Sequence, residues 1–139
     1  MGLRTAAERG SVMSKLEEIR EEFKKDRFAT DAVGIVIDCA EPGKAVCSLA
    51  LKPHHMNANN VPMGGAIFTL ADFTCAVAAN GYSERMTVSQ NASITFLAPA
   101  RGERLTAEAA CLRSGRTTAL LTVDIRDELD TYVAHAAVN

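Results

Sequence analysis

The sequence is poor in the features that mark several classes of protein. It has no tryptophan, and its 15 Lys and Arg residues are outnumbered by 17 Asp and Glu residues. A chain without surplus positive charge has little with which to neutralise a phosphate backbone, which argues against a nucleic-acid partner. No apolar run reaches the roughly 18 residues that a membrane span needs. We therefore expect neither nucleic-acid binding nor membrane insertion.

The sequence also lacks the marks of secretion and of metal binding. No apolar stretch follows Met1, so we expect no secretory signal. The four cysteines have no CxxC spacing, which argues against a zinc or redox motif. A tight turn between Cys39 and Cys47 would place Cys39 opposite Val46 and Cys47 on the other face of the sheet, so we expect no disulfide there. Unpaired thiols favour a reducing compartment, and we expect a cytoplasmic protein without a metal.

A chain of 139 residues fits one domain. Residues 1–13 show no periodicity and are interpreted as a flexible N-terminal arm, so that residues 14–139 form the domain. Ser14 followed by Glu17 is a capping box, which predicts that a helix starts there. Apolar residues at helical spacing continue this N-terminal helix.

The remaining segments predict an α+β fold. Residues 32–39 and 44–51 are short, β-branched and apolar, and they predict a hairpin around Pro42-Gly43. Residues 66–79 are apolar on nearly every side, as in a buried helix. Four further strands are predicted at 86–97, 103–113, 116–126 and 131–138. Strands joined by short turns form an antiparallel sheet, and about six of them curving around the apolar helix would bury it.

Asp72 is the only charged residue between positions 53 and 83. A carboxylate in apolar surroundings costs several kcal/mol unless it is paired or hydrogen-bonded, so Asp72 is the leading site candidate. The alternative is a structural Asp that bonds a backbone group or a hydroxyl near Thr69 or Thr74. Gly64 and Gly65 start the same helix, where free N–H groups favour a developing oxyanion. The alternative there is a tight helix entry that needs small residues.

The segment NANNVPMGGAIFTLAD, from Asn57 to Asp72, resembles the signature of the hotdog-fold acyl-CoA thioesterases, in particular their phenylacetate-degradation type. That signature has an Asn, a short loop, His-Gly-Gly and then a helix carrying Leu-Ala-Asp. Residues 93–100 (SITFLAPA) and Gly115-Arg116 also look like the family's third strand and a later turn. The resemblance covers about residues 30–138 and implies a long central helix wrapped by an antiparallel sheet.

The resemblance further implies an activity, the hydrolysis of an acyl-CoA thioester to a free acid and coenzyme A. No cofactor is expected, because coenzyme A is part of the substrate. By similarity, the Gly64 N–H polarises the thioester oxygen, and Asp72 acts as general base or as nucleophile. Asn57 would orient substrate or water, and Ser89 would help to hold the attacking water. The alternatives are that Asn57 is a turn residue and that Ser89 is an ordinary strand serine.

Met63 is a departure, because the family usually has a His before the two glycines. Met neither donates nor accepts a strong hydrogen bond. A non-catalytic acyl-CoA-binding protein and the dehydratase branch of the same fold therefore remain alternatives. His54 and His55 lie nine and eight residues upstream of Met63. Either one of them compensates for Met63 or both are exposed loop histidines, and we favour the second interpretation.

Gly64 and Asp72 are eight residues apart on one predicted helix, about 12 Å at a rise of about 1.5 Å per residue. A single chain cannot easily bring both to one carbonyl group, so we expect a homodimer with shared sites. The resemblance adds the pairing of dimers into a homotetramer. The candidate substrate-binding residues are Met63, Gly65, Phe68, Arg113 and Arg116. The two arginines would face the phosphates of coenzyme A, and Met63 and Phe68 would line an acyl pocket unless they are plain core residues.

Overall fold

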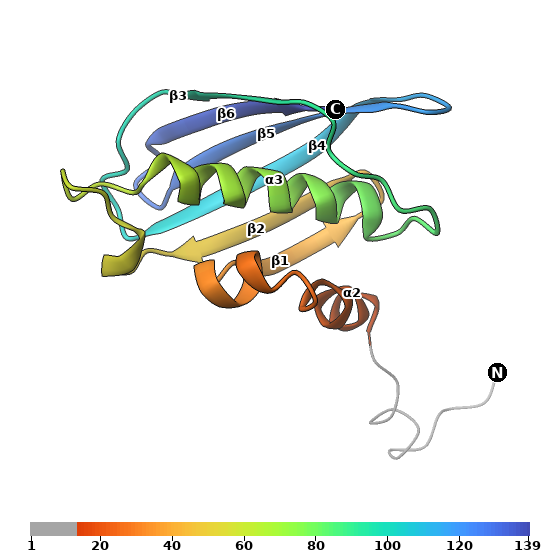
Figure 1. The fold of residues 1–139 in the computed structure, drawn as a ribbon, viewed down its shortest axis with the longest axis horizontal. Helices are drawn as coiled ribbons and strands as arrows, with labels where there is room; N and C mark the ends of the chain where they lie inside the picture. The colour runs from red at the N-terminus through yellow and green to blue at the C-terminus, as the bar shows by residue number, and fades with distance from the viewer. Residues whose placement is uncertain (1–13) are drawn as a thin grey trace, which may run out of the picture.

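The computed structural model of the chain describes residues 14–139, so the arm predicted at 1–13 lies outside the described residues. Figure 1 shows the long helix α3 (Gly64–Asn80) across one face of an antiparallel sheet, with helix α2 (Lys15–Phe23) beside it. The six strands follow the order β1-β2-β4-β5-β6-β3. Their bounds are β1 Val36–Glu41, β2 Lys44–Ala50, β3 Ala92–Phe96, β4 Arg104–Ser114, β5 Ala119–Asp127 and β6 Tyr132–Val138. The predicted combination of a sheet and a central helix is confirmed.

The N-terminal helix begins where the capping box predicts. The Ser14 hydroxyl accepts the Glu17 N–H at 3.2 Å, and the Glu17 carboxylate accepts the Ser14 N–H at 3.3 Å. A π-helical turn, η1 (Phe28–Val33), follows α2, so the strand predicted at 32–39 is wrong in its first residues. Val33 is buried at the end of η1, and Gly34 then takes a left-handed φ of 92° that a strand does not use. Tertiary packing has overridden the β-propensity of this segment.

The β1–β2 hairpin turns at Pro42-Gly43, and Gly43 has the positive φ of 74° that such a turn requires. Cys39 lies opposite Val46 in this ladder, as predicted. Cys39 is exposed, Cys47 is buried, and neither forms a disulfide. Burial raises the pKa of the Cys47 thiol to about 12, so this thiol stays protonated at neutral pH.

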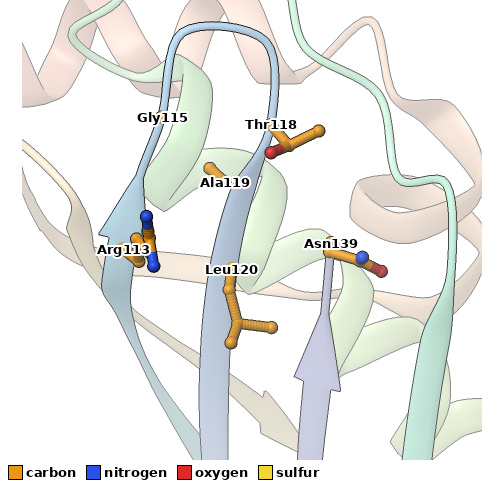
Figure 2. A pocket seen from close by; sticks show the side chains of 6 residues that line it. All are labelled: Arg113, Gly115, Thr118, Ala119, Leu120 and Asn139. Atoms are coloured by element: carbon orange, nitrogen blue, oxygen red, sulfur yellow. The ribbon is translucent and has the colours of Figure 1, made fainter.

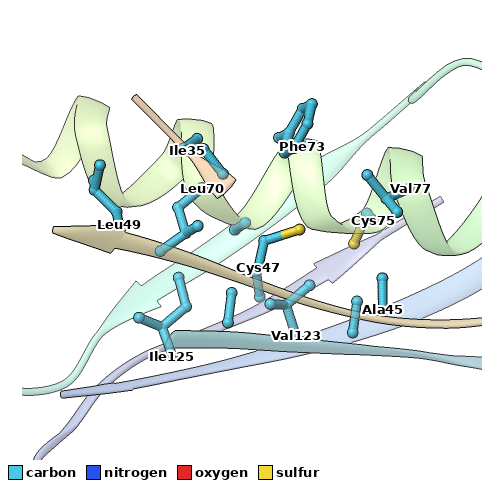
Figure 3. Close-up of a cluster of buried hydrophobic side chains, with 14 of the residues drawn as sticks. Ile35, Ala45, Cys47, Leu49, Leu70, Phe73, Cys75, Val77, Val123 and Ile125 are labelled. Carbon is cyan, nitrogen blue, oxygen red and sulfur yellow. The ribbon is translucent and has the colours of Figure 1, made fainter. Parts of the chain in front are cut away.

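Helix α3 supplies the centre of the core. Figure 3 shows Leu70, Phe73 and Val77 on α3 above side chains of the sheet, including Leu49 of β2 and Val123 of β5. Removing each such large side chain from water contributes about 1.5–3 kcal/mol. The helix has apolar neighbours on most sides, which explains why its sequence shows little amphipathic contrast. Within residues 14–139, no helix combines the length and apolarity needed to cross a membrane.

The strand predicted at 86–97 is shorter in the structure, where β3 covers only Ala92–Phe96. Residues 86–90 have no strand partner in the described part of the chain. Two of them bond to α3 instead, since the Thr87 N–H donates to the Asn80 side chain at 2.9 Å and Ser89 donates to Asp72. The alternating pattern of this segment predicted a strand, but a strand also needs a neighbour. The other three predicted strands agree with β4, β5 and β6 to within three residues at each end.

Candidate active site

The first turn of α3 presents free backbone donors. Met63 is the N-cap residue, and its carbonyl accepts the N–H groups of Ala66 and Ile67 at 3.0 and 3.2 Å. Among residues 14–139, no acceptor receives the N–H of Gly64 or of Gly65. Two unpaired donors at the positive end of a 17-residue helix form a suitable place for a carbonyl oxygen that gains negative charge.

A pocket of about 330 Å³ lies beside Gly64. The residues that line it come from the loop before α3, from α3 itself, from the end of β3 and from β6: Asn57, Val61, Pro62, Gly64, Ile67, Phe96, Leu97, Ala98, Pro99 and Val133. None of these side chains is charged, and Asn57 is the only one with a polar group. The Phe96 ring lies against Gly64, because a Cβ built on this glycine would be 3.1 Å from Phe96 Cζ. The pocket suits an uncharged, apolar group placed next to the free N–H.

Asp72 lies in the middle of α3 and is half-buried. The Ser89 hydroxyl donates to Asp72 Oδ1 at 2.8 Å. The hydroxyls of Thr69 and Thr74 donate instead to helix carbonyls one turn earlier, at 2.8 and 2.6 Å. The alternative in which Asp72 is satisfied by these threonines is therefore wrong. Ser89 lies in a loop, whereas a strand was predicted for it, and its role in holding the attacking water stays a prediction.

Asn57 is a turn residue that also lines the pocket, and its role in orienting substrate or water stays a prediction. Its side-chain oxygen accepts the N–H groups of Asn59 and Val61 at 2.9 and 3.3 Å, so it holds the turn before α3. It also lines the pocket beside Gly64. Gly64 and Asp72 both belong to α3, and eight residues of helix separate them by about 12 Å. One chain therefore does not bring these two groups to a single reacting atom.

His55 is buried, so its interpretation as an exposed loop histidine is wrong. Only 5% of this residue is exposed. Its Nδ1 atom accepts the Lys52 N–H at 2.9 Å, and its Nε2 atom is 2.6 Å from the Val33 carbonyl. His54 is exposed, as expected. Nothing in the local pattern separates the two histidines, because the partner that buries His55 is 22 residues upstream.

The candidate substrate-binding residues do not all lie at one pocket. Figure 2 shows Arg113 in a second pocket, of about 320 Å³, with Thr118, Leu120 and Asn139. Arg113 is the last residue but one of β4, and Arg116 is in the turn after this strand. This turn lies near the end of the sheet that is opposite the start of α3 (Figure 1). The structure therefore separates the two arginines from the Gly64 pocket of the same chain. Gly65, Met63 and Phe68 lie at or near the start of α3 but are not among the residues that line that pocket.

A further titratable cluster lies where β5 meets β6. Asp124 accepts a hydrogen bond from the Tyr132 hydroxyl and lies 2.8 Å from His135 Nδ1. The Tyr132 hydrogen bond and His135 hold the pKa of Asp124 below its usual value, although burial opposes this. The same hydrogen bond raises the pKa of Tyr132. In residues 14–139, no three His, Cys, Asp or Glu side chains are grouped as metal ligands would be.

Comparison with known proteins decides the family. The profile of the thioesterase superfamily matches residues 59–134, which is more than half of the chain and includes Gly64, Asp72 and Ser89. The chain belongs to the thioesterase superfamily. It is 31% identical to human acyl-coenzyme A thioesterase 13 over 122 residues, covering 85% of this chain and 86% of the relative. It is also 31% identical over 104 residues to the Escherichia coli acyl-coenzyme A thioesterase PaaI, covering 74% of each chain.

Solved structures agree with this assignment. The E. coli PaaI protein from the phenylacetic acid degradation operon superposes with a TM-score of 0.81 at 26% identity, covering 89% of this chain and 90% of that one. A Streptococcus mutans protein bound to acetyl CoA superposes with a TM-score of 0.70 at 25% identity, covering 75% and 84%. The predicted hotdog fold and the resemblance to PaaI-type thioesterases are confirmed.

Proposed function

We propose that this thioesterase hydrolyses acyl-CoA to a free acid and coenzyme A, with Asp72 as its catalytic carboxylate. The observation that carries the proposal is the half-buried Asp72 on α3, whose one oxygen is held by Ser89 at 2.8 Å. This hydrogen bond fixes the side chain and leaves its second oxygen for water or substrate. The names of the human and E. coli relatives support acyl-CoA as the substrate class.

The proposed site forms between two subunits. Gly64 of one subunit would bind the thioester oxygen, and the partner's Asp72 would act on the carbonyl carbon, so that a two-fold axis creates two sites. β3 is an edge strand that pairs with β6 on one side only, and it supports such a pairing, because exposed apolar side chains lie on it and before it. Met86 and Val88 are 79% and 82% exposed, and Phe96 is 53% exposed. A second subunit at this edge would remove these side chains from water.

Two chemical routes are consistent with this geometry. As a general base, Asp72 takes a proton from water while the water oxygen attacks the carbonyl carbon. As a nucleophile, its carboxylate attacks directly and forms a mixed anhydride that water then hydrolyses. In both routes the carbonyl oxygen gains negative charge beside the Gly64 N–H, and the C–S bond then breaks. The coenzyme A thiolate takes the proton that Asp72 removed from water in the first route, and a proton from solvent in the second.

The position of Arg113 and Arg116 fits a shared site. The end of β4 and the β4–β5 turn, which carry them, lie toward the C-terminal end of α3 (Figure 1) and away from the Gly64 of their own chain. In a site built from one subunit's Gly64 and the partner's Asp72, the arginines of the Asp72 subunit would face the phosphates of coenzyme A. The homotetramer and the cytoplasmic location remain proposals, from the resemblance and from the four free cysteines.

Release of free thiol from a panel of acetyl-, hexanoyl-, phenylacetyl-, benzoyl- and palmitoyl-CoA tests the proposal. We expect Asp72→Asn to lower kcat by about 10²- to 10⁴-fold, the usual contribution of a positioned acid–base group. Asn keeps an oxygen for Ser89, so the fold should survive. Asp31→Asn, at an exposed carboxylate of η1, is the matched control. Undiminished turnover by Asp72→Asn would exclude the proposed role.

A non-catalytic acyl-CoA-binding protein is the second candidate, and Met63 favours it. Met63 is exposed at the N-cap and gives the first turn of α3 no side-chain cap. Acyl-CoA binding measured by calorimetry, without thiol release on any member of the panel, would support this candidate. The dehydratase alternative is weaker, because that branch requires a catalytic His and both ring nitrogens of His55 are occupied by backbone groups.

A further inference from the structure

We propose that His55 is a positioning residue that sets the direction of the Gly64 N–H, without touching the substrate. This inference rests on the proposed function, in which that N–H binds the thioester oxygen. His55 acts through Met63, which bonds to the His55 backbone and directly precedes Gly64 in the chain. His55 is buried and does not line the pocket, so it is an additional residue on which the site depends.

The two partners of His55 define the tautomer of its ring. Lys52 donates its N–H to Nδ1 at 2.9 Å, so Nδ1 must be the unprotonated nitrogen. Nε2 then carries the proton and donates to the Val33 carbonyl at 2.6 Å. Only the neutral ring protonated on Nε2 makes both bonds. The side chain thus joins the end of η1 to the exit of β2.

The backbone of His55 continues this connection to the start of α3. Its carbonyl accepts the Met63 N–H at 2.8 Å. Met56 and Pro62 form an isolated antiparallel bridge just inside this bond, so the loop between them is closed at its base by His55 and Met63. Gly64 follows Met63 directly, and its N–H is therefore one peptide away from an anchored bond.

This anchor matters because no side chain within residues 14–139 caps the first turn of α3. Ser, Thr, Asp or Asn at an N-cap holds the first turn through its side chain, but Met63 cannot do so. The bond from the Met63 N–H to the His55 carbonyl does not cap the N–H groups of this turn, but it fixes the residue that precedes Gly64. Loss of the His55 ring would leave two part-buried backbone groups unpaired, the Lys52 N–H and the Val33 carbonyl. The loop base would move to regain partners, and the Gly64 N–H would move with it.

The test compares three variants of His55 with two controls. We expect His55→Ala to lower kcat by about 10- to 100-fold with KM changed less than about threefold, because misplacement near 1 Å costs up to 10²-fold. His55→Gln places an amide near the Nε2 position and can still donate to the Val33 carbonyl. His55→Asn places an oxygen near Nδ1 and can still accept from Lys52. Each should restore part of the lost kcat, since each keeps one of the two bonds.

The controls separate positioning from stability. His54→Asn changes the neighbouring exposed histidine and should leave kcat unchanged. Val33→Ala removes a buried side chain at the same place but keeps the carbonyl that His55 bonds. It should lower the melting temperature while keeping kcat. Equal loss of kcat in Val33→Ala and His55→Ala, at equal loss of melting temperature, would reduce His55 to a structural residue and overturn the inference.

Amide hydrogen exchange gives a readout that needs no turnover. In His55→Ala the N–H groups of Met63 and Ala66, which are hydrogen-bonded in the wild type, should exchange faster, whereas those in the middle of α3 should not. Unchanged exchange at Met63 and Ala66 would overturn the inference even if the wild type were inactive on every acyl-CoA. Wild-type inactivity with faster exchange in His55→Ala would instead reject the proposed function alone.

Discussion

Asp127 shows what a buried carboxylate does when it is not catalytic. Only 5% of it is exposed, and it accepts the N–H groups of Arg101, Gly102, Leu129 and Thr131 at 2.8 to 3.0 Å. Burial alone would raise the pKa of Asp127, but these backbone donors hold it well below the usual range. The side chain therefore ties the β5–β6 turn to the loop that leads from the Gly64 pocket to β4.

Replacing this carboxylate should lower the stability of the fold and make that stability less sensitive to acid. We expect Asp127→Asn to lower the free energy of unfolding at pH 7 by about 2 kcal/mol, the size of a bond to a charged group. A depressed pKa stabilises the fold at pH values above the unfolded pKa of about 3.9, and this stabilisation is lost as the pH falls further. The variant should therefore lose less stability than the wild type between pH 4 and pH 2.

Urea denaturation at several pH values measures both effects. Asp130→Asn is the control, because Asp130 is an exposed residue of the same turn with a φ of 63° that Asn tolerates well. It should change neither the stability nor its slope with pH appreciably. An Asp127→Asn variant with the stability and acid response of the wild type would contradict the role assigned to this carboxylate.

At the scale of elements, two substitutions at the start of α3 distinguish the effect of losing the Gly64 N–H from the effect of adding a side chain there. Gly64→Ala and Gly64→Pro both add a Cβ that lies 3.1 Å from the exposed Phe96 ring, and a modest ring shift relieves this contact. Only Pro also removes the N–H, and Pro is well tolerated at the first position of a helix. Met63 already has φ −66° and ψ 140°, the conformation favoured before a proline.

We therefore expect Gly64→Pro to lower kcat by about 10²- to 10³-fold relative to Gly64→Ala, the cost of one lost oxyanion donor. Circular dichroism should show the same helix content in both variants. Steady-state thiol release on the best acyl-CoA of the panel measures the difference. If the two variants had equal kcat values, the Gly64 N–H could not be the donor that stabilises the transition state.

The elements that could be predicted from the sequence are those whose pattern does not depend on a distant partner. The apolar helix α3, the hairpin at Pro42-Gly43 and the strands β4 to β6 follow from periodicity and turn residues. Asp72 stood out as a lone charge in an apolar helix. The errors at 32–35 and 86–91 have the opposite cause, because packing of Val33 and the bond from Ser89 to Asp72 decided those segments. The burial of His55 could not be predicted for the same reason, since its hydrogen-bond partners are defined only by the fold.

At the scale of the whole molecule, the geometry of α3 implies that two subunits must assemble to form a complete site. Its rigid turns keep Gly64 and Asp72 about 12 Å apart whatever the side chains do. A complete site then requires the start of one α3 to face the middle of another. The exposed edge of β3, next to the Gly64 pocket and preceded by Met86 and Val88, offers a surface where a second copy could bring the two helices together.

Mixing two inactive variants tests this arrangement directly. In a dimer of one Gly64→Pro chain and one Asp72→Asn chain, one site carries both defects and the other carries none. Random pairing makes about half of the dimers mixed, each with one intact site, so unfolding and refolding an equimolar mixture should restore about a quarter of wild-type activity. Each variant refolded alone should stay inactive. A site contained in one chain would gain nothing from mixing, because every chain would still carry a defect.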